Sequence, residues 1–223
     1  MTETALIEES IMETTDLKQG SLRNIRFLSH VLLAGILSIL LHELGHCIFY
    51  WIQGIPAAMS LVKEYPLQDI SATQYAIGST GGPLSNILQI AVAYGLHERY
   101  KESWRARRWF SAFILANTFY FILRSLEALL KGKGGELESV ASLIGVNYLY
   151  VVGLFGLLTI TFLSLWISRN RIRISLKNGG FFLGLFFSYV FALSVIHALD
   201  RMILWHRFPT IQIDDGREYN SHR

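Results

Sequence analysis

Long, almost entirely apolar stretches constrain the fold of this 223-residue chain more than any other feature. A helix needs about 20 apolar residues to cross the hydrocarbon core of a bilayer. Only 17% of the residues are charged and 52% are hydrophobic, whereas soluble domains carry about 25% charged residues. The sequence therefore predicts an all-α polytopic membrane protein with about five spans, allowing four to six. The expected spans are 27–52, 73–96, 109–130, 148–167 and 180–205.

The charged residues lie mainly between and outside these stretches and divide the chain into three parts. Residues 1–26 are expected to form a polar, acidic N-terminal tail, 27–205 a membrane-embedded domain, and 206–223 a polar C-terminal tail. Lys and Arg gather in the loops after the second and fourth spans, which by the positive-inside rule predicts a cytoplasmic N-terminus. A formal net charge of only +3 without a basic stripe argues against nucleic-acid binding. The expected surroundings are a lipid bilayer.

The pentapeptide His42-Glu43-Leu44-Gly45-His46 lies late in the first expected span and has the form HExxH. On a helix of 3.6 residues per turn, His42 and His46 face the same side and reach one ion. Zinc is typically held by such imidazoles, a third protein ligand and a water, and Glu43 is placed to act on that water as general base. The competing interpretation is a chance match. A charged residue near the bilayer centre costs about 2.5 kcal/mol or more, however, and usually marks function.

A second motif follows at the start of the next span, Gly81-Gly82-Pro83-Leu84-Ser85-Asn86. Together with HELGH inside an apolar helix, it resembles the site-2 protease family of intramembrane zinc metalloproteases, over about the first three spans. The resemblance implies hydrolysis of peptide bonds in or near the transmembrane segments of membrane-protein substrates. It also implies that Asn86 binds substrate or the developing oxyanion. The residues alone equally allow an interhelical hydrogen bond from Asn86, supported by closely packed small residues.

The third metal ligand is predicted from the same resemblance. The family supplies an Asp from an Asp-Gly segment, which this chain lacks, and the segment beginning Gly134-Gly135-Glu136 resembles it instead. Glu136 is therefore the predicted ligand, followed by Asp200 and Glu138. Simpler roles compete for each: the two glutamates would favour the N-terminus of a short helix, and Asp200 would pair with Arg201 or cap a helix end. Glu127 is expected to pair with Arg124, three residues earlier.

Span order supplies an independent expectation. His42 and His46 lie late in the first span, Asn86 early in the second and Glu136 after the third, so all should meet near one membrane surface. Segment 53–70 is either a hairpin that offers an edge to an extended substrate or an ordinary amphipathic loop.

Two other functions stay open, a noncatalytic membrane scaffold related to these proteases and a zinc-dependent hydrolase of lipid amides or esters. The sequence does not constrain the oligomeric state.

Overall fold

The computed structural model describes the backbone of residues 3–131, 135–169, 176–204, 207–214, 216 and 218–219, and most side chains from residue 25 onward. Its helices are α1 (Glu3–Ile52), α2 (Ala72–Arg99), α3 (Trp104–Lys131), α4 (Gly135–Ile144), α5 (Tyr148–Arg169) and α6 (Leu176–Ile203). Strands β1 (Ala57–Met59) and β2 (Glu64–Pro66) form an antiparallel hairpin, as do β3 (Ile211–Gln212) and β4 (Glu218–Tyr219). The predicted all-α class is confirmed.

Four of the described helices are long and apolar enough to cross a membrane. The stretches are Ile25–Ile52, Trp104–Leu130, Tyr148–Arg169 and Gly179–Ile203, in α1, α3, α5 and α6. The remaining expected span corresponds to α2, whose first half is rich in Gly, Ser and Thr. This helix has less need of apolar side chains because it packs against α1, α3 and α4. The protein is thus a polytopic membrane protein in which α2 packs its small and polar residues against neighbouring helices and leaves Leu84, Leu88 and Val92 exposed.

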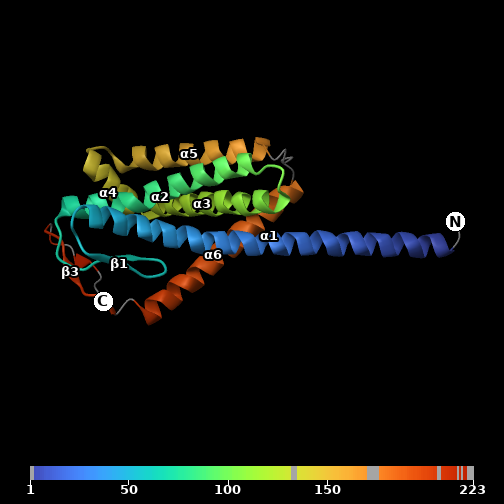
Figure 1. The fold of residues 1–223 in the computed structure, drawn as a ribbon, viewed down its shortest axis with the longest axis horizontal. Helices are drawn as coiled ribbons and strands as arrows, with labels where there is room; N and C mark the ends of the chain where they lie inside the picture. The colour runs from blue at the N-terminus through green and yellow to red at the C-terminus, as the bar shows by residue number, and fades with distance from the viewer. Residues whose placement is uncertain are drawn as a thin grey trace.

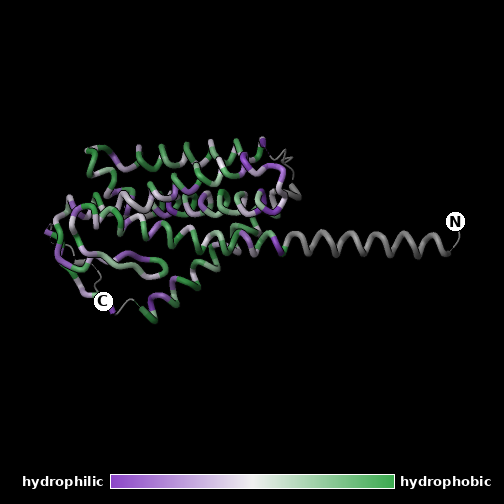
Figure 2. The backbone as a smooth tube through the Cα atoms, in the orientation of Figure 1, coloured by the Kyte–Doolittle hydropathy of each residue, from purple (hydrophilic) through white to green (hydrophobic). Residues whose placement is uncertain are grey.

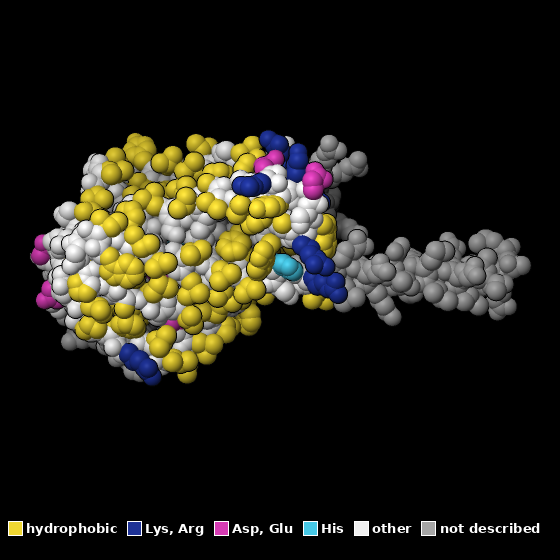
Figure 3. Space-filling view, in the orientation of Figure 1, with side chains coloured by type: hydrophobic (Ala, Val, Ile, Leu, Met, Phe, Trp, Pro, Cys, Tyr) yellow, Lys and Arg dark blue, Asp and Glu magenta, His cyan; other side chains and the backbone are white. Residues whose placement is uncertain are grey.

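The long helices lie roughly along one direction, while α6 crosses the bundle obliquely (Figure 1). Helix α4 and the β1–β2 hairpin lie at the same end of the bundle, next to the end of α1 (Figure 1). Hydrophobic residues dominate the described tube and its outer surface, and charged side chains collect toward the ends (Figures 2 and 3). This distribution is the one that lipid requires of a bundle surface.

Helices α1 and α2 approach so closely that their backbones touch. A Cβ added to Gly45 would lie 2.5 Å from the Gly81 carbonyl oxygen, and one added to Gly81 would lie 2.2 Å from the Gly45 carbonyl oxygen. Small residues permit this approach in membrane helices. Ser71 and Gln74 start α2 with a capping box, and the helix continues through Pro83 without interruption. The glycine motif therefore places α2 directly against the histidine-bearing face of α1.

The described part of the C-terminal segment packs against the α1–α2 connection. Ile211 and Ile213 are buried in one apolar cluster with Tyr50, Ile55 and Ile70. The Ile70 N–H donates to the Gln212 carbonyl at 3.2 Å, and the aromatic rings of Tyr65 and Phe208 stack 3.6 Å apart. Residues 207–214 thus pack against the α1–α2 connection and its β1–β2 hairpin, although their composition predicted only a polar tail.

Candidate metal centre

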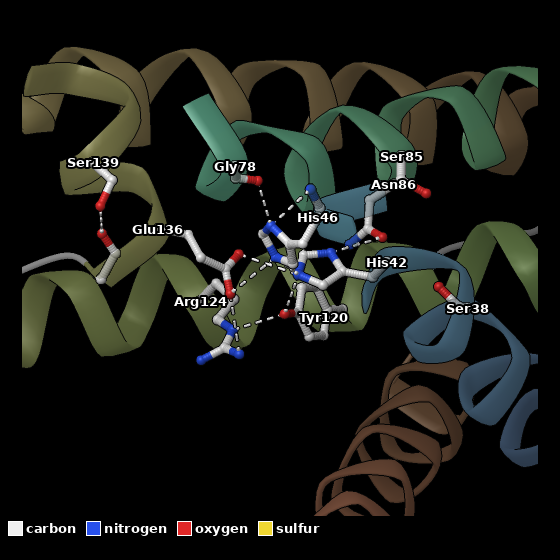
Figure 4. A network of polar contacts seen from close by, with 12 residues as sticks. Ser38, His42, His46, Gly78, Ser85, Asn86, Tyr120, Arg124, Glu136 and Ser139 are labelled. Atoms are coloured by element: carbon white, nitrogen blue, oxygen red, sulfur yellow. Dashed lines mark hydrogen bonds and ion pairs between the residues drawn. The ribbon is translucent and has the colours of Figure 1, made fainter. Parts of the chain in front are cut away.

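Three side chains from two separate helices converge in the interior at the hairpin end of the bundle (Figure 4). The Nε2 atoms of His42 and His46 lie 3.1 Å apart, and the Glu136 carboxylate lies 3.2 Å from the first and 3.8 Å from the second. Two ligand atoms held at about 2.0–2.1 Å by one tetrahedral zinc are about 3.3 Å apart. The donor types and their spacing therefore fit one zinc ion. The residues expected to meet from span order do lie together.

The outer nitrogens of both imidazoles fix which nitrogen faces the centre. His46 Nδ1 lies 2.9 Å from the Gly78 carbonyl oxygen, and His42 Nδ1 lies 3.2 Å from Asn86 Oδ1. Both partners accept, so each Nδ1 donates and each Nε2 presents a lone pair. The Gly82 N–H also lies 3.2 Å from His46 Nδ1, but the shorter contact with the carbonyl decides the tautomer. Two lone pairs 3.1 Å apart repel, and a cation between them removes the conflict.

The space beside these nitrogens exists because residue 82 is glycine. A Cβ at Gly82 would lie 2.2 Å from His46 Nε2 and 2.5 Å from His42 Nε2. No real side-chain carbon occupies such distances from another heavy atom. The Gly-Gly-Pro motif therefore has two parts with different roles: Gly81 meets the α1 backbone, whereas Gly82 leaves room at the ligand atoms.

Glu43 lies on the adjacent face of α1 and has an acidic neighbour that the sequence did not indicate. Glu43 is buried, and among the described residues its Oε2 has no hydrogen-bond partner. Ligand atoms of Glu43, His46 and Glu64 lie within 4.8 Å of one another, so β2 carries a buried carboxylate into the site. In the sequence Glu64 follows Lys63 in a segment bounded by prolines, which is typical of a solvated loop. Only the hairpin turns it inward.

The two acidic candidates, Glu136 and Glu64, are separable by metal content. We expect Glu136→Gln to reduce the zinc bound by purified protein from about one ion per chain to a small fraction, because it removes the carboxylate that faces both Nε2 atoms. The matched variant Glu64→Gln should retain zinc. Atomic absorption on both proteins, each checked for monodispersity, measures this. The reverse pattern would make Glu64 the third ligand.

The other sequence candidates occupy different places. Asp200 is buried and accepts hydrogen bonds from the Ser60 hydroxyl at 2.7 Å and the Leu61 N–H at 2.9 Å, so it ties α6 to the hairpin tip. Neither Asp200 nor Glu138 belongs to a group of converging ligand atoms in the part of the chain that the structure describes. Asn86 contacts His42 through its Oδ1, which lies beside Nδ1, the ring nitrogen that does not face the other ligands.

Helix α3 adds a polar chain that runs to the same nitrogens (Figure 4). The Tyr120 hydroxyl lies 3.1 Å from His42 Nε2, and Arg124 Nε donates to that hydroxyl at 3.0 Å. Arg124 also contacts Glu127 at 2.9 Å, as the sequence predicted, and Glu136 at 3.6 Å. Burial works against ionisation of Glu136, but the positive charge beside it, which the Arg124 guanidinium carries, outweighs burial and holds the pKa of that carboxyl well below its usual range. The Glu136 carboxylate is therefore ionised, as a metal ligand requires.

Two cavities have residues of this polar chain in their walls. One, of about 200 Å³, is lined by His42, Pro83 and Glu136 among others. The second, of about 520 Å³, opens between α1, α3, α6 and the hairpin and reaches Glu43. Pro83 therefore faces a cavity within the protein, as expected for a proline at membrane depth.

Comparison of the chain with models of protein families, with curated protein sequences and with solved structures finds no match.

Proposed function

We propose that this protein is an intramembrane zinc metalloprotease, similar to the site-2 proteases, that hydrolyses peptide bonds in or near transmembrane segments of membrane-protein substrates. One observation carries the proposal. Two imidazole lone pairs and an ionised carboxylate converge with the spacing of zinc ligands, directly beside the buried carboxyl of Glu43. A metal site needed only for structure would have no use for an additional acidic side chain between its two histidines.

The residues divide the chemistry among them. His42, His46 and Glu136 would hold zinc, which when bound supplies Lewis-acid activation of water and of the substrate carbonyl. Glu43 takes one proton from the water while the water oxygen bonds to the carbonyl carbon and the C=O electron pair moves to the carbonyl oxygen. As the C–N bond breaks, Glu43 returns that proton to the leaving nitrogen. Water, peptide and products balance, and Glu43 ends in its starting state.

The position of the site supports a membrane-protein substrate. Both histidines belong to a stretch of α1 that is apolar enough to cross a bilayer, and the larger cavity lies beside α6, whose apolar stretch is largely exposed. A hydrophobic segment could approach Glu43 from lipid along this side. The distribution of Lys and Arg favours a cytoplasmic N-terminus, which would place the site toward the opposite membrane surface.

Metal dependence of cleavage tests the proposal. Detergent-purified wild type should contain about one zinc per chain and cleave at least one member of a panel of transmembrane reporter peptides. A chelator should stop cleavage and added zinc should restore it. His46→Ala should lose both zinc and cleavage, whereas His30→Ala, which changes a histidine of the same helix outside the site, should lose neither.

The panel also includes lipid amides and esters, so that the results distinguish a protease from a lipid hydrolase and from a noncatalytic scaffold. Hydrolysis of lipids without peptides would favour a lipid hydrolase. Zinc binding without hydrolysis of either class would favour the noncatalytic scaffold. Wild type without zinc under metal-replete conditions would overturn the metal centre and the proposed function together.

A further inference from the structure

We propose that Tyr120 forms an oxyanion-binding site in which its hydroxyl donates to the substrate oxygen that becomes negatively charged during hydrolysis. Arg124 is the positioning residue behind it. This inference rests on the proposed function and assigns the component that the metal ligands and Glu43 do not supply. Donors aimed at developing charge are often the largest single contribution to catalysis.

The direction of the Tyr120 proton follows from its two contacts. Arg124 can only donate, and its Nε lies 3.0 Å from the phenol oxygen, so it occupies a lone pair of that oxygen. The phenol proton must therefore point elsewhere, and the acceptor in reach is His42 Nε2 at 3.1 Å. Tyr120 thus donates toward the ligand atom of His42. The guanidinium polarises the phenol and strengthens it as a donor.

A bound metal ion would change the acceptor of the Tyr120 hydrogen bond, while the Tyr120 hydroxyl would remain the donor. If His42 Nε2 held a zinc ion with its lone pair, the Tyr120 hydroxyl would lose that acceptor. Tyr120 is only 7% exposed, and a buried hydroxyl without an acceptor is costly. The carbonyl oxygen of a peptide bound at the metal would lie in the same region and would accept this hydrogen bond. Its negative charge grows as water adds, so the bond strengthens toward the transition state.

Asn86 uses its amide oxygen on the far edge of the imidazole, while its amide nitrogen is buried and has no hydrogen-bond partner among the described residues. Its Oδ1 accepts from His42 Nδ1, whereas Tyr120 contacts Nε2 on the metal-facing edge. Asn86 therefore orients the histidine through its oxygen. The resemblance to site-2 proteases implies substrate or oxyanion binding by this asparagine, and Tyr120 on α3 is a further donor, the one that contacts a ligand nitrogen.

The cavities place the same residues where a substrate bond would lie. Tyr120 and Arg124 line both the cavity with His42 and Glu136 and the larger one that reaches Glu43. A peptide that occupied both cavities would pass beside these two residues. Tyr120 belongs to the walls of both cavities, and its hydroxyl is the part that faces the ligand nitrogens (Figure 4).

The test combines Tyr120→Phe with a probe that resembles the charged intermediate. The bond cleaved in a reporter peptide is mapped by mass spectrometry and replaced by a phosphinate, whose tetrahedral anionic group mimics the oxyanion. We expect Tyr120→Phe to lower kcat by about 10² to 10³-fold, the usual effect of removing one oxyanion donor. It should weaken phosphinate binding by a similar factor while leaving KM and zinc content unchanged. Tyr189→Phe is the matched control, because its buried hydroxyl has no hydrogen-bond partner among the described residues.

Three results would overturn this assignment. Wild-type kcat in Tyr120→Phe would exclude a catalytic role, and loss of zinc would make Tyr120 a metal ligand or a structural residue. An equal loss of affinity for substrate and phosphinate would mean general binding and no preference for the charged form. By contrast, a wild type that binds zinc but cleaves no peptide contradicts the proposed function itself, so the two failures are distinguishable.

Discussion

Replacement of Gly82 by alanine is expected to abolish zinc binding, and with it all hydrolysis. The added Cβ would lie 2.2 Å from His46 Nε2 and 2.5 Å from His42 Nε2, in the space where both ligand atoms point. The two imidazole rings cannot easily move away from this Cβ, because hydrogen bonds at their Nδ1 atoms hold them against α2. Replacing outer-shell partners usually costs about 10 to 100-fold in metal affinity, and a direct obstruction should cost more. Zinc content of the purified variant measures the effect.

Gly95→Ala is the matched control because it changes a glycine of the same helix. A Cβ at Gly95 meets nothing within 4 Å, and alanine stabilises an exposed helix interior by about 0.5 to 1 kcal/mol relative to glycine. This variant should keep its zinc and its activity. Normal zinc affinity in Gly82→Ala would show that the ion is held elsewhere, and would remove the physical reason for the glycine at this position.

Glu43→Gln should abolish cleavage while leaving the metal in place. Glutamine preserves the shape and one carbonyl oxygen but cannot take a proton from water, and general-base catalysis is typically worth about 10² to 10⁴-fold in rate. Zinc should remain because His42, His46 and Glu136 form a complete group of ligand atoms without Glu43, which converges with His46 and Glu64 instead. Initial rates on a reporter peptide, divided by the zinc-loaded enzyme concentration, give the loss.

Thermal unfolding provides the check on folding in this variant. Glu43 and Glu64 are buried neighbours, and removing one of two adjacent carboxyls relieves repulsion, so the melting temperature should stay the same or rise. Glu98→Gln, which changes a side chain paired with Arg169 far along α2, should keep full activity. A zinc-loaded Glu43→Gln protein that cleaves at the wild-type rate would contradict the mechanism and assign the base to another residue.

Local periodicity was enough to predict the part of the site that lies on one helix. Residues four apart share a helical face, so His42 and His46 had to point together wherever the helix packed. The helices themselves follow from apolar stretches, and four of the five expected spans meet the length and hydropathy criteria. Glu136 was placed by resemblance and span order, because nothing local connects it with a helix that precedes it by some 90 residues.

The residues that were missed depend on tertiary structure or on a weaker pattern. Glu64 enters the site only because the hairpin folds it inward, which no local rule predicts. Tyr120 is not among the site residues predicted from the sequence, yet the sequence contains a signal for it. Four polar residues of the third span, Asn117, Tyr120, Arg124 and Glu127, recur with the spacing of a single helical face. In a membrane helix, such a stripe marks the side that faces a polar interior.

The docking of the C-terminal segment has a consequence for the order in which the protein forms. Ile211 and Ile213 close the cluster around Ile70, and the N–H of Ala72 donates to Asp214 at 2.6 Å. These contacts join the first and second helices to residues synthesised about 140 positions later. The hairpin end of the bundle therefore cannot complete its packing until the last long helix is inserted. The helix that carries His42 and His46 is therefore synthesised well before residues 207–214, which pack beside its end.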